Sequence, residues 1–208
     1  MVVGQSVRHA IDDWEQRKFE AAMLHACNAI DGTAGKLYPA LGNKERFTRT
    51  LRENYEILGP MGAPGIDLVE TRFPVSVKGP TAPDGKPDIA DVIYGIHRCV
   101  HAHGDELPGG FELLQDAAGP KQVTHMEIER GKVRLSDRFI FGLLAVAVFS
   151  PANHDQSIKE LDGYFLTFGK SAKLMINEWW GRASGFPAIA AQEPMPQVKL
   201  DFGNWSRP

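Results

Sequence analysis

Apolar side chains recur every three or four positions over several stretches of the chain, which is the spacing of amphipathic helices. The clearest stretch is residues 17–37, where Phe19, Met23, Ala26 and Ile30 follow this spacing. The same pattern predicts helices over residues 6–14, 44–58, 88–106, 136–149 and 164–180. We therefore expect a mainly α protein, an up-and-down helical bundle.

A different periodicity appears over residues 124–135. Met126 and Ile128 alternate with glutamates, Val133 and Leu135 alternate with basic residues, and Gly131 lies at the turn between them. Strict alternation on both sides of a turn predicts a small β-hairpin. We also expect residues 69–77 to be extended and residues 81–87 to form a loop.

Glycine and proline mark the remaining boundaries. The glycine-rich residues 59–65 predict a turn that closes the helix before them, since they lack the Gly-Lys-Ser/Thr ending of a phosphate loop. Four prolines and little periodicity over residues 186–208 predict an extended tail. The expected organisation is one domain over residues 1–185, with β insertions around 69–77 and 123–135, followed by this tail.

Composition narrows the possible partners and location. A net charge of −3 over 208 residues argues against an overall electrostatic grip on nucleic acid but leaves room for a local basic patch. The longest apolar run, residues 139–149, is too short to span a bilayer, and the first residues do not resemble a signal peptide. Two cysteines, Cys27 and Cys99, form no disulfide framework. We therefore expect a cytoplasmic protein with no membrane partner.

The densest chemistry lies at the end of the helix predicted over residues 88–106. His97, Arg98, His101, His103 and Asp105 fall within nine positions, and the chain has seven histidines in all. An imidazole can remove a proton from a ribose 2′-hydroxyl or protonate the leaving oxygen. A guanidinium can hold a phosphate and stabilise the charge of the transition state. These residues therefore suit phosphodiester cleavage, which needs no metal when RNA supplies the nucleophile.

Two alternatives compete at the same helix end. On an ideal helix Arg98 and His103 lie about 140° apart, so His103 packing at the helix end with Arg98 in solvent is the simpler interpretation. His97 and His101 are four residues apart, a spacing that suits one metal ion with Asp105, His25 or His125 as third ligand. A solvated helix face explains those two histidines as well.

Arg98 and His103 are separated by four residues late in a predicted helix. This motif resembles that of the HEPN superfamily, the higher-eukaryote-and-prokaryote nucleotide-binding helical domains. The helical patterns of residues 11–15 and 21–26 are also similar to its early helices. Many active members carry a polar residue after the arginine, whereas this chain has Cys99.

The resemblance implies a homodimer and metal-independent endoribonuclease activity without a cofactor. The products would be a 2′,3′-cyclic phosphate and a 5′-hydroxyl. His103 would be the acid/base and Arg98 the phosphate clamp, with His97, His101 and Asp105 in support. Such domains often serve as toxins with an antitoxin partner or in antiviral defence, and some are only binding modules.

A basic stripe over residues 44–52 gives weaker support to RNA binding. Arg46, Arg49 and Arg52 recur every third residue and follow Lys44, although Glu45 and Glu53 interrupt them. A solvated helix face explains the same pattern. Two other functions stay open: a non-catalytic helical module that dimerises or binds a partner protein or a nucleotide, and a metal-dependent hydrolase using His97 and His101.

Overall fold

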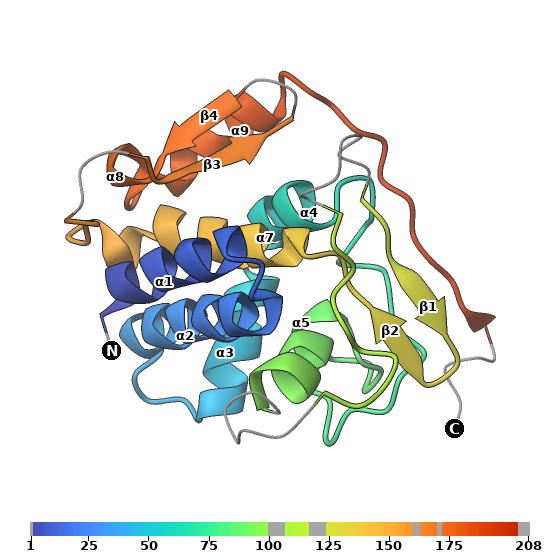
Figure 1. Cartoon of the computed structure of the whole chain (residues 1–208). Helices are drawn as coiled ribbons and strands as arrows, with labels where there is room; N and C mark the ends of the chain where they lie inside the picture. Colours follow the sequence, from blue (N-terminus) through green and yellow to red (C-terminus); the bar gives the residue numbers. More distant parts are fainter. Residues whose placement is uncertain (1, 100–106, 117–123, 160–162, 170–171, 204–208) are drawn as a thin grey trace.

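The computed structural model describes residues 2–99, 107–116, 124–159, 163–169 and 172–203. Within these ranges the chain is mainly α-helical with two short antiparallel hairpins, which confirms the expected fold class (Figure 1). The helices are α1 (Val3–Glu15), α2 (Phe19–Leu37), α3 (Asn43–Arg52), α4 (Tyr55–Gly62), α5 (Ile89–Val92), α7 (Arg138–Phe149), α8 (Ile176–Trp179) and α9 (Phe186–Ala190). The strands are β1 (Glu127–Glu129), β2 (Lys132–Arg134), β3 (Phe165–Phe168) and β4 (Ala172–Met175). A π-helical segment (Ile93–Arg98) continues α5, and Pro151–Asn153 and Ala183–Gly185 form single 3₁₀ turns.

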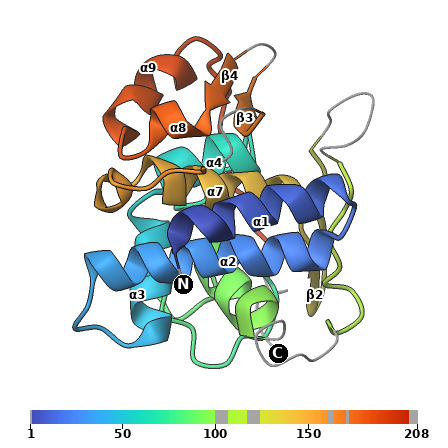
Figure 2. The same ribbon diagram turned by 60° about the vertical axis from the view of Figure 1, so that its left-hand side comes forward.

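Helix α7 lies at the centre of the core. It packs against α1, α2, α4 and α8, and from Phe139 to Phe149 every side chain except that of Phe141 is buried. A helix that is apolar on all sides requires such surroundings, because no side of it is suited to water. Figure 2 shows α1 and α2 running side by side over one flank of this core.

The hairpin β1–β2 confirms the alternation read from residues 124–135. Ile128 pairs with Val133, and Gly131 takes a positive φ of 78° in the turn. The backbone N–H of Gly131 donates to the carbonyl oxygen of Pro74 at 2.9 Å. The segment 69–77 forms no strand, contrary to expectation. Its Phe73 and Val75 are buried, but Pro74 has no N–H to donate to a ladder.

Residues 44–58 do not form one helix as predicted. Helix α3 ends at Arg52, and Asn54 begins a new helix, α4, with its carbonyl oxygen accepting from the N–H groups of Ile57 and Leu58. Because α4 starts at Tyr55 and ends at Gly62, it includes Pro60 and the first half of the predicted turn.

The largest error of the sequence interpretation concerns residues 164–180, which were expected to be helical. They form the β3–β4 hairpin and only then the single turn of α8. Leu166 and Phe168 are buried while Thr167 between them is exposed, a two-residue period. Gly169 follows with a positive φ of 59°, and this conformation suits the turn.

The C-terminal segment was expected to be extended from residue 186 onward, but it begins with the helix α9. Phe186 of α9 is buried against the rings of Phe149 and Phe168. Beyond α9 the segment is extended and runs past the loop after α4, where Val198 forms a parallel bridge with Ile66 (Figure 1). The N–H of Val198 donates to Gly65 at 2.8 Å, and Asp67 donates back to Val198 at 3.0 Å.

A buried charge network fixes the start of α5. The Arg52 guanidinium on α3 donates to both carboxylate oxygens of Asp88, at 2.6 and 2.9 Å, and also lies 2.9 Å from Asp91. Asp88 and Asp91 are buried, and the Tyr55 hydroxyl donates to Asp88 at 2.9 Å. Burial alone raises the pKa of Asp88, but the hydrogen bonds from Arg52 and the N–H of Asp91 outweigh it and lower the pKa below the ordinary value.

Replacing the arginine of this network should destabilise the protein strongly. Arg52→Met leaves two buried carboxylates without their cation, and we expect a loss of about 3 kcal/mol in the free energy of unfolding, measured by urea denaturation. Because the pKa of Asp88 is lowered in the folded state, its contribution to stability is present at neutral pH. That contribution disappears as the pH falls through the folded-state pKa. Arg49→Met removes an exposed partner of Glu53 on the same helix, so equal losses in the two variants would contradict the argument.

A second prediction concerns the close crossing of α4 and α7. A methyl group on Gly142 would lie 2.9 Å from Leu58 Cδ1 and 3.1 Å from Gly62 Cα. Gly142→Ala should therefore cost about 1–3 kcal/mol of unfolding free energy. Gly35→Ala, inside α2, meets no atom closer than 3.8 Å, so it should stabilise by up to about 1 kcal/mol. Thermal unfolding of both variants tests the opposite signs.

Candidate functional site

Arg98 lies at the end of a helical stretch whose first residues are fixed by a cap on α5. The Asp88 carboxylate accepts the N–H of Asp91 at 3.0 Å and caps α5. After Val92 the helix widens into the π-helical segment, a rare conformation that is frequent at functional sites. Gly95 is required here, because a Cβ on it would lie 2.5 Å from Val77 Cγ1.

Arg98 is held at the end of this segment by two neighbours. Its Nε donates to Asp31 Oδ2 on α2 at 2.9 Å, and its guanidinium carbon lies 5.5 Å from the ring centroid of Tyr94. The side chain of Arg98 is 22% exposed and that of Asp31 is 18% exposed. Burial alone lowers the pKa of Arg98, but the charge and hydrogen bond of Asp31 outweigh it, so the guanidinium stays protonated.

The contact with Asp31 orients the guanidinium. An arginine has five N–H donors, and the bond to Asp31 uses the one on Nε. Among the residues that the structure describes, no hydrogen bond of Arg98 uses its Nη groups. The Oδ1 oxygen of Asp31 is buried and has no hydrogen-bond partner there either. The four Nη donors are the part of this side chain suited to an anion.

The other residues predicted at this helix end divide into two groups. His97 is fully buried, so the expectation that it lies on a solvated helix face is wrong. His97 follows the buried Ile93 by four positions, so the two side chains lie on the same face of the helix and both point into the core. His101, His103 and Asp105 lie outside the described residues. The structure therefore joins Arg98 to Asp31 and Tyr94, and it leaves the arginine–histidine pairing as a prediction.

The predicted basic stripe on α3 is divided among different contacts. Arg52 belongs to the buried network with Asp88. Arg49 is exposed, and its Nε donates to Glu53 at 2.8 Å. Arg46 lies beside α2 with its Nε buried. The three arginines therefore do not form one exposed row, because Arg52 is held in the buried network with Asp88.

Sequence reasoning missed Asp31 and Tyr94. Tyr94 is four residues before Arg98, a helical spacing at which side chains meet, so this contact was within reach of the sequence. Asp31 is 67 positions away on another helix. Only the packing of α2 against the π-helical segment brings it to Arg98, and no local pattern signals that contact.

A cavity of about 190 Å³ lies between α1, α7 and β3, and aromatic side chains form much of its wall. The rings of Trp14 and Phe141 meet edge to face with centroids 4.9 Å apart, and Phe165 lines the β3 side. The Trp14 indole N–H donates to the buried Asp137 at 3.1 Å, which fixes the ring. Arg138 and Glu15 are the charged side chains that line it, so the cavity combines apolar walls with one cation and one carboxylate.

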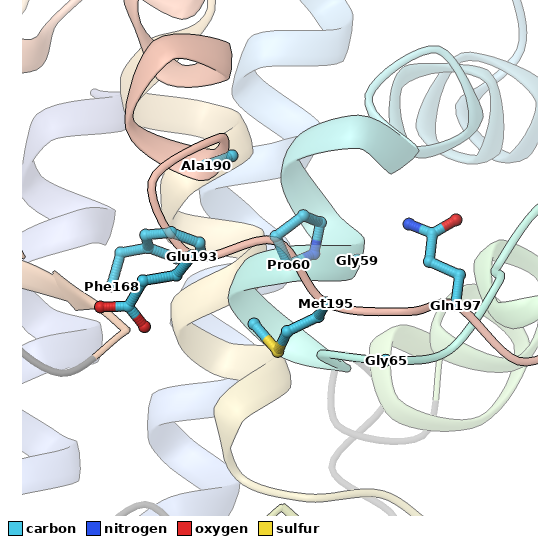
Figure 3. A pocket seen from close by; sticks show the side chains of 8 residues that line it. All are labelled: Gly59, Pro60, Gly65, Phe168, Ala190, Glu193, Met195 and Gln197. Carbon is cyan, nitrogen blue, oxygen red and sulfur yellow. The ribbon is translucent and has the colours of Figure 1, made fainter.

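A second cavity, of about 180 Å³, lies between α4, the end of β3 and the C-terminal segment (Figure 3). Figure 3 shows Met195 beside Pro60, and Glu193 beside Phe168. Its polar side chains are the carboxylate of Glu193 and the amide of Gln197, and none of the described residues that line it is a cation. This cavity is therefore poorly suited to a phosphate group.

The packing of α2 against the Arg98 segment predicts different reactivity for the two thiols. Cys27 is fully buried, and burial raises the pKa of its thiol far above the ordinary value, whereas Cys99 is partly exposed. We expect a disulfide-exchange reagent such as DTNB to modify Cys99 first and Cys27 only on unfolding. Cys99→Ser should abolish the fast phase. A fast phase that persists in Cys99→Ser would show that Cys27 is accessible.

No helix among the described residues is long and apolar enough to cross a membrane. No solved structure matches the chain. Three similar proteins are the uncharacterized protein Mb1320 of Mycobacterium bovis and the uncharacterized proteins MT1327 and Rv1289 of Mycobacterium tuberculosis. Each is 42% identical over 207 residues, which cover 97% of this chain and 94% of the relative. A family model described as Rv1289 matches residues 2–206, and the chain therefore belongs to the Rv1289 family.

Proposed function

We propose that this protein is a metal-independent endoribonuclease of the HEPN type, with its site at the end of the Arg98 segment. The observation that carries the proposal is the orientation of Arg98, which Asp31 holds through Nε at 2.9 Å while its Nη groups make no described hydrogen bond. A fixed guanidinium five residues before a histidine suits the recognition of a phosphodiester.

The proposed chemistry assigns one role to each residue. The His103 imidazole removes the proton from a ribose 2′-hydroxyl, and the resulting oxygen attacks the adjacent phosphorus. The bond from phosphorus to the 5′-oxygen breaks while a protonated imidazole, that of His103 or of His103 in the second copy of the chain, donates a proton to this oxygen, which leaves a 2′,3′-cyclic phosphate and a 5′-hydroxyl. Arg98 binds the phosphate oxygens and stabilises their developing charge. A second copy of the chain supplies the other arginine–histidine pair in a homodimer.

The supporting residues have more limited roles in this proposal. His97 is buried, so it acts by supporting the helix and does not touch RNA. His101 and Asp105 orient His103. Arg46 and Arg49 extend the phosphate contacts, but Arg52 does not, since the buried network uses its guanidinium. The same proposal includes an RNA substrate and a homodimer. It also includes an antitoxin partner, if the protein serves in a toxin or antiviral system.

The test is cleavage of a mixed RNA in EDTA, with chemical analysis of the new ends. We expect cyclic phosphate ends from the wild type and a loss of about 10²–10⁴-fold in rate for His103→Ala. Arg98→Ala should lose about 10²–10³-fold. Asp31→Asn keeps a hydrogen-bond acceptor but removes the charge, so it should lower the rate less than Arg98→Ala.

The control is Arg49→Ala, which removes an arginine from the neighbouring surface and leaves Arg98 and Asp31 intact. It should weaken RNA binding without changing the chemistry of the ends. Equal background cleavage by the wild type and His103→Ala would refute the ribonuclease.

The cavity between α1, α7 and β3 favours a second candidate, a non-catalytic module that binds a nucleotide or another planar anion. Its aromatic walls and Arg138 provide a surface for a ring and a donor for a negative group. A protein that cleaves no RNA but binds nucleoside monophosphates in calorimetric titration would support this candidate over the first.

A further inference from the structure

Arg46 is a cation that pairs with no carboxylate among the described residues. Its guanidinium lies against α2, because a Cβ on Gly35 would be 3.8 Å from Arg46 Nη1 and 3.9 Å from its Cζ. Its Nε is buried and has no hydrogen-bond partner, whereas its Nη atoms are not buried. Arg46 therefore holds its guanidinium on the surface of α2 with Nη donors that no described residue uses.

Arg46 and Arg98 lie along the same face of α2. Arg98 Nε donates to Asp31, and Gly35, which contacts Arg46, follows Asp31 by four residues. Four residues of an α-helix make about one turn with roughly 6 Å of rise, so Asp31 and Gly35 share a face. The two guanidiniums are therefore about one helical turn apart, a spacing at which each can bind a different phosphate of one strand.

Lys44 is the neighbour of Arg98 on the side of Tyr94. Lys44 Nζ lies 6.0 Å and Arg98 Cζ lies 5.5 Å from the centroid of the Tyr94 ring. Lys44 Nζ donates to the carbonyl oxygens of Lys78 and Gly79, which fix the ammonium without neutralising its charge. Because an ammonium has three donors, one remains for an anion.

The three cations occupy separate positions, with Arg98 in the middle. Lys44 and Arg46 are two positions apart on α3, so their side chains leave that helix about 200° apart. Arg46 extends toward α2, and Lys44 extends toward the Tyr94 ring. Arg98 contacts both α2 and that ring, so it has one of the other two cations on each side.

The group of three has an excess of positive charge. Within the part of the chain that the structure describes, Asp31 is the one carboxylate that pairs with any of them. Glu45 lies between Lys44 and Arg46 in the sequence, but it is exposed and forms no ion pair with a described residue. A local excess of this sign, in a chain whose net charge is −3, suits an anionic ligand with several charges.

We propose that Arg46, Arg98 and Lys44 bind three consecutive phosphates of one RNA strand, with the scissile phosphate on Arg98. This inference rests on the proposed ribonuclease and names its substrate as a strand with a phosphate on each side of the cleaved bond. Each contact between a cation and a phosphate releases condensed counterions, so binding depends on the number of phosphates and on salt. A dinucleotide supplies the scissile phosphate alone and should bind weakly.

The experiment is a calorimetric titration of the full chain with 2′-O-methyl oligouridylates that carry one or three phosphates, at several salt concentrations. The methyl group removes the nucleophile, so binding is measured without cleavage. In the wild type, a plot of the logarithm of the binding constant against that of the salt concentration should be steeper by about 1.4 for three phosphates than for one. Lys44→Met and Arg46→Met should each reduce the three-phosphate slope by about 0.7 and leave binding of the one-phosphate ligand unchanged.

The matched control is Lys173→Met. Lys173 on β4 also lies over an aromatic ring, with its Nζ 3.8 Å from the centroid of Phe165. Figure 1 shows β4 on the opposite side of the core from α3. This variant changes the net charge by the same amount, but its slope should equal that of the wild type. Lys44 is partly exposed, so Lys44→Met should keep its far-ultraviolet circular dichroism, and it decides the matter if Arg46→Met misfolds.

The outcomes separate this inference from the proposed ribonuclease. Equal slopes for one and three phosphates in the wild type, no binding of the three-phosphate ligand, or a wild-type slope in Lys44→Met would overturn the three phosphate positions. If the wild type still cleaved RNA in that case, the ribonuclease would stand. A slope that depends on phosphate number and falls in Lys44→Met would support the three positions, even in a protein that cleaves no RNA, and the ribonuclease alone would then be refuted.

Discussion

The contact of Arg52 with Asp88 and Asp91 places the helix on which the candidate site depends. Two carboxylates at the start of α5 are buried, and each is stable there only because a cation and several hydrogen-bond donors surround it. Thr81 adds its hydroxyl and its N–H to Asp91 Oδ1, both at 2.8 Å. The network therefore ties α3, the loop before α5 and α5 itself into one unit. Because the π-helical segment continues α5, this network also sets the direction in which that segment runs.

Arg52 and Arg98 show how a structural arginine and a candidate-site arginine differ in this chain. Arg52 contacts two carboxylates and the Thr81 hydroxyl, so several of its nitrogens are used within the fold. Arg98 uses only Nε on a single carboxylate among the described residues. The first arrangement leaves little capacity for another ligand. The second fixes a guanidinium and leaves its Nη donors without a hydrogen bond to any described residue, an arrangement suited to binding an anion.

Periodicity predicted the elements whose packing is simple. Helix α2 and the hairpin β1–β2 follow from regular apolar spacing, because each element turns one consistent set of side chains toward the core. Helix α7 follows from its continuous apolar run, because a helix without a polar side must be buried. Apolar spacing predicted the wrong element, a helix, over residues 164–180. Apolar residues are dense there, and a helix and a hairpin both account for them until the exposure of Thr167 is known.

The candidate site was predictable only in part. Arg98 stands out by its crowded neighbourhood, and Tyr94 by its helical spacing. The burial of His97 was not predicted, although His97 follows Ile93 of the apolar face by four positions and could have been placed there by spacing. The contact of Arg98 with Asp31 joins two helical segments that are far apart in the sequence. Such contacts come from tertiary packing, so one sequence gives no local signal for them.

The pairing of Val198 with Ile66 has a consequence for the order in which the chain folds during synthesis. Helices α1 to α4 form contacts among near neighbours in sequence and can assemble while later residues are still being added. The loop after α4 cannot be completed in this way, because its backbone partner Val198 follows much later in the sequence. The backbone groups of this loop therefore stay without their partner until Val198 has been made, and a chain cut before Val198 would leave them open to solvent.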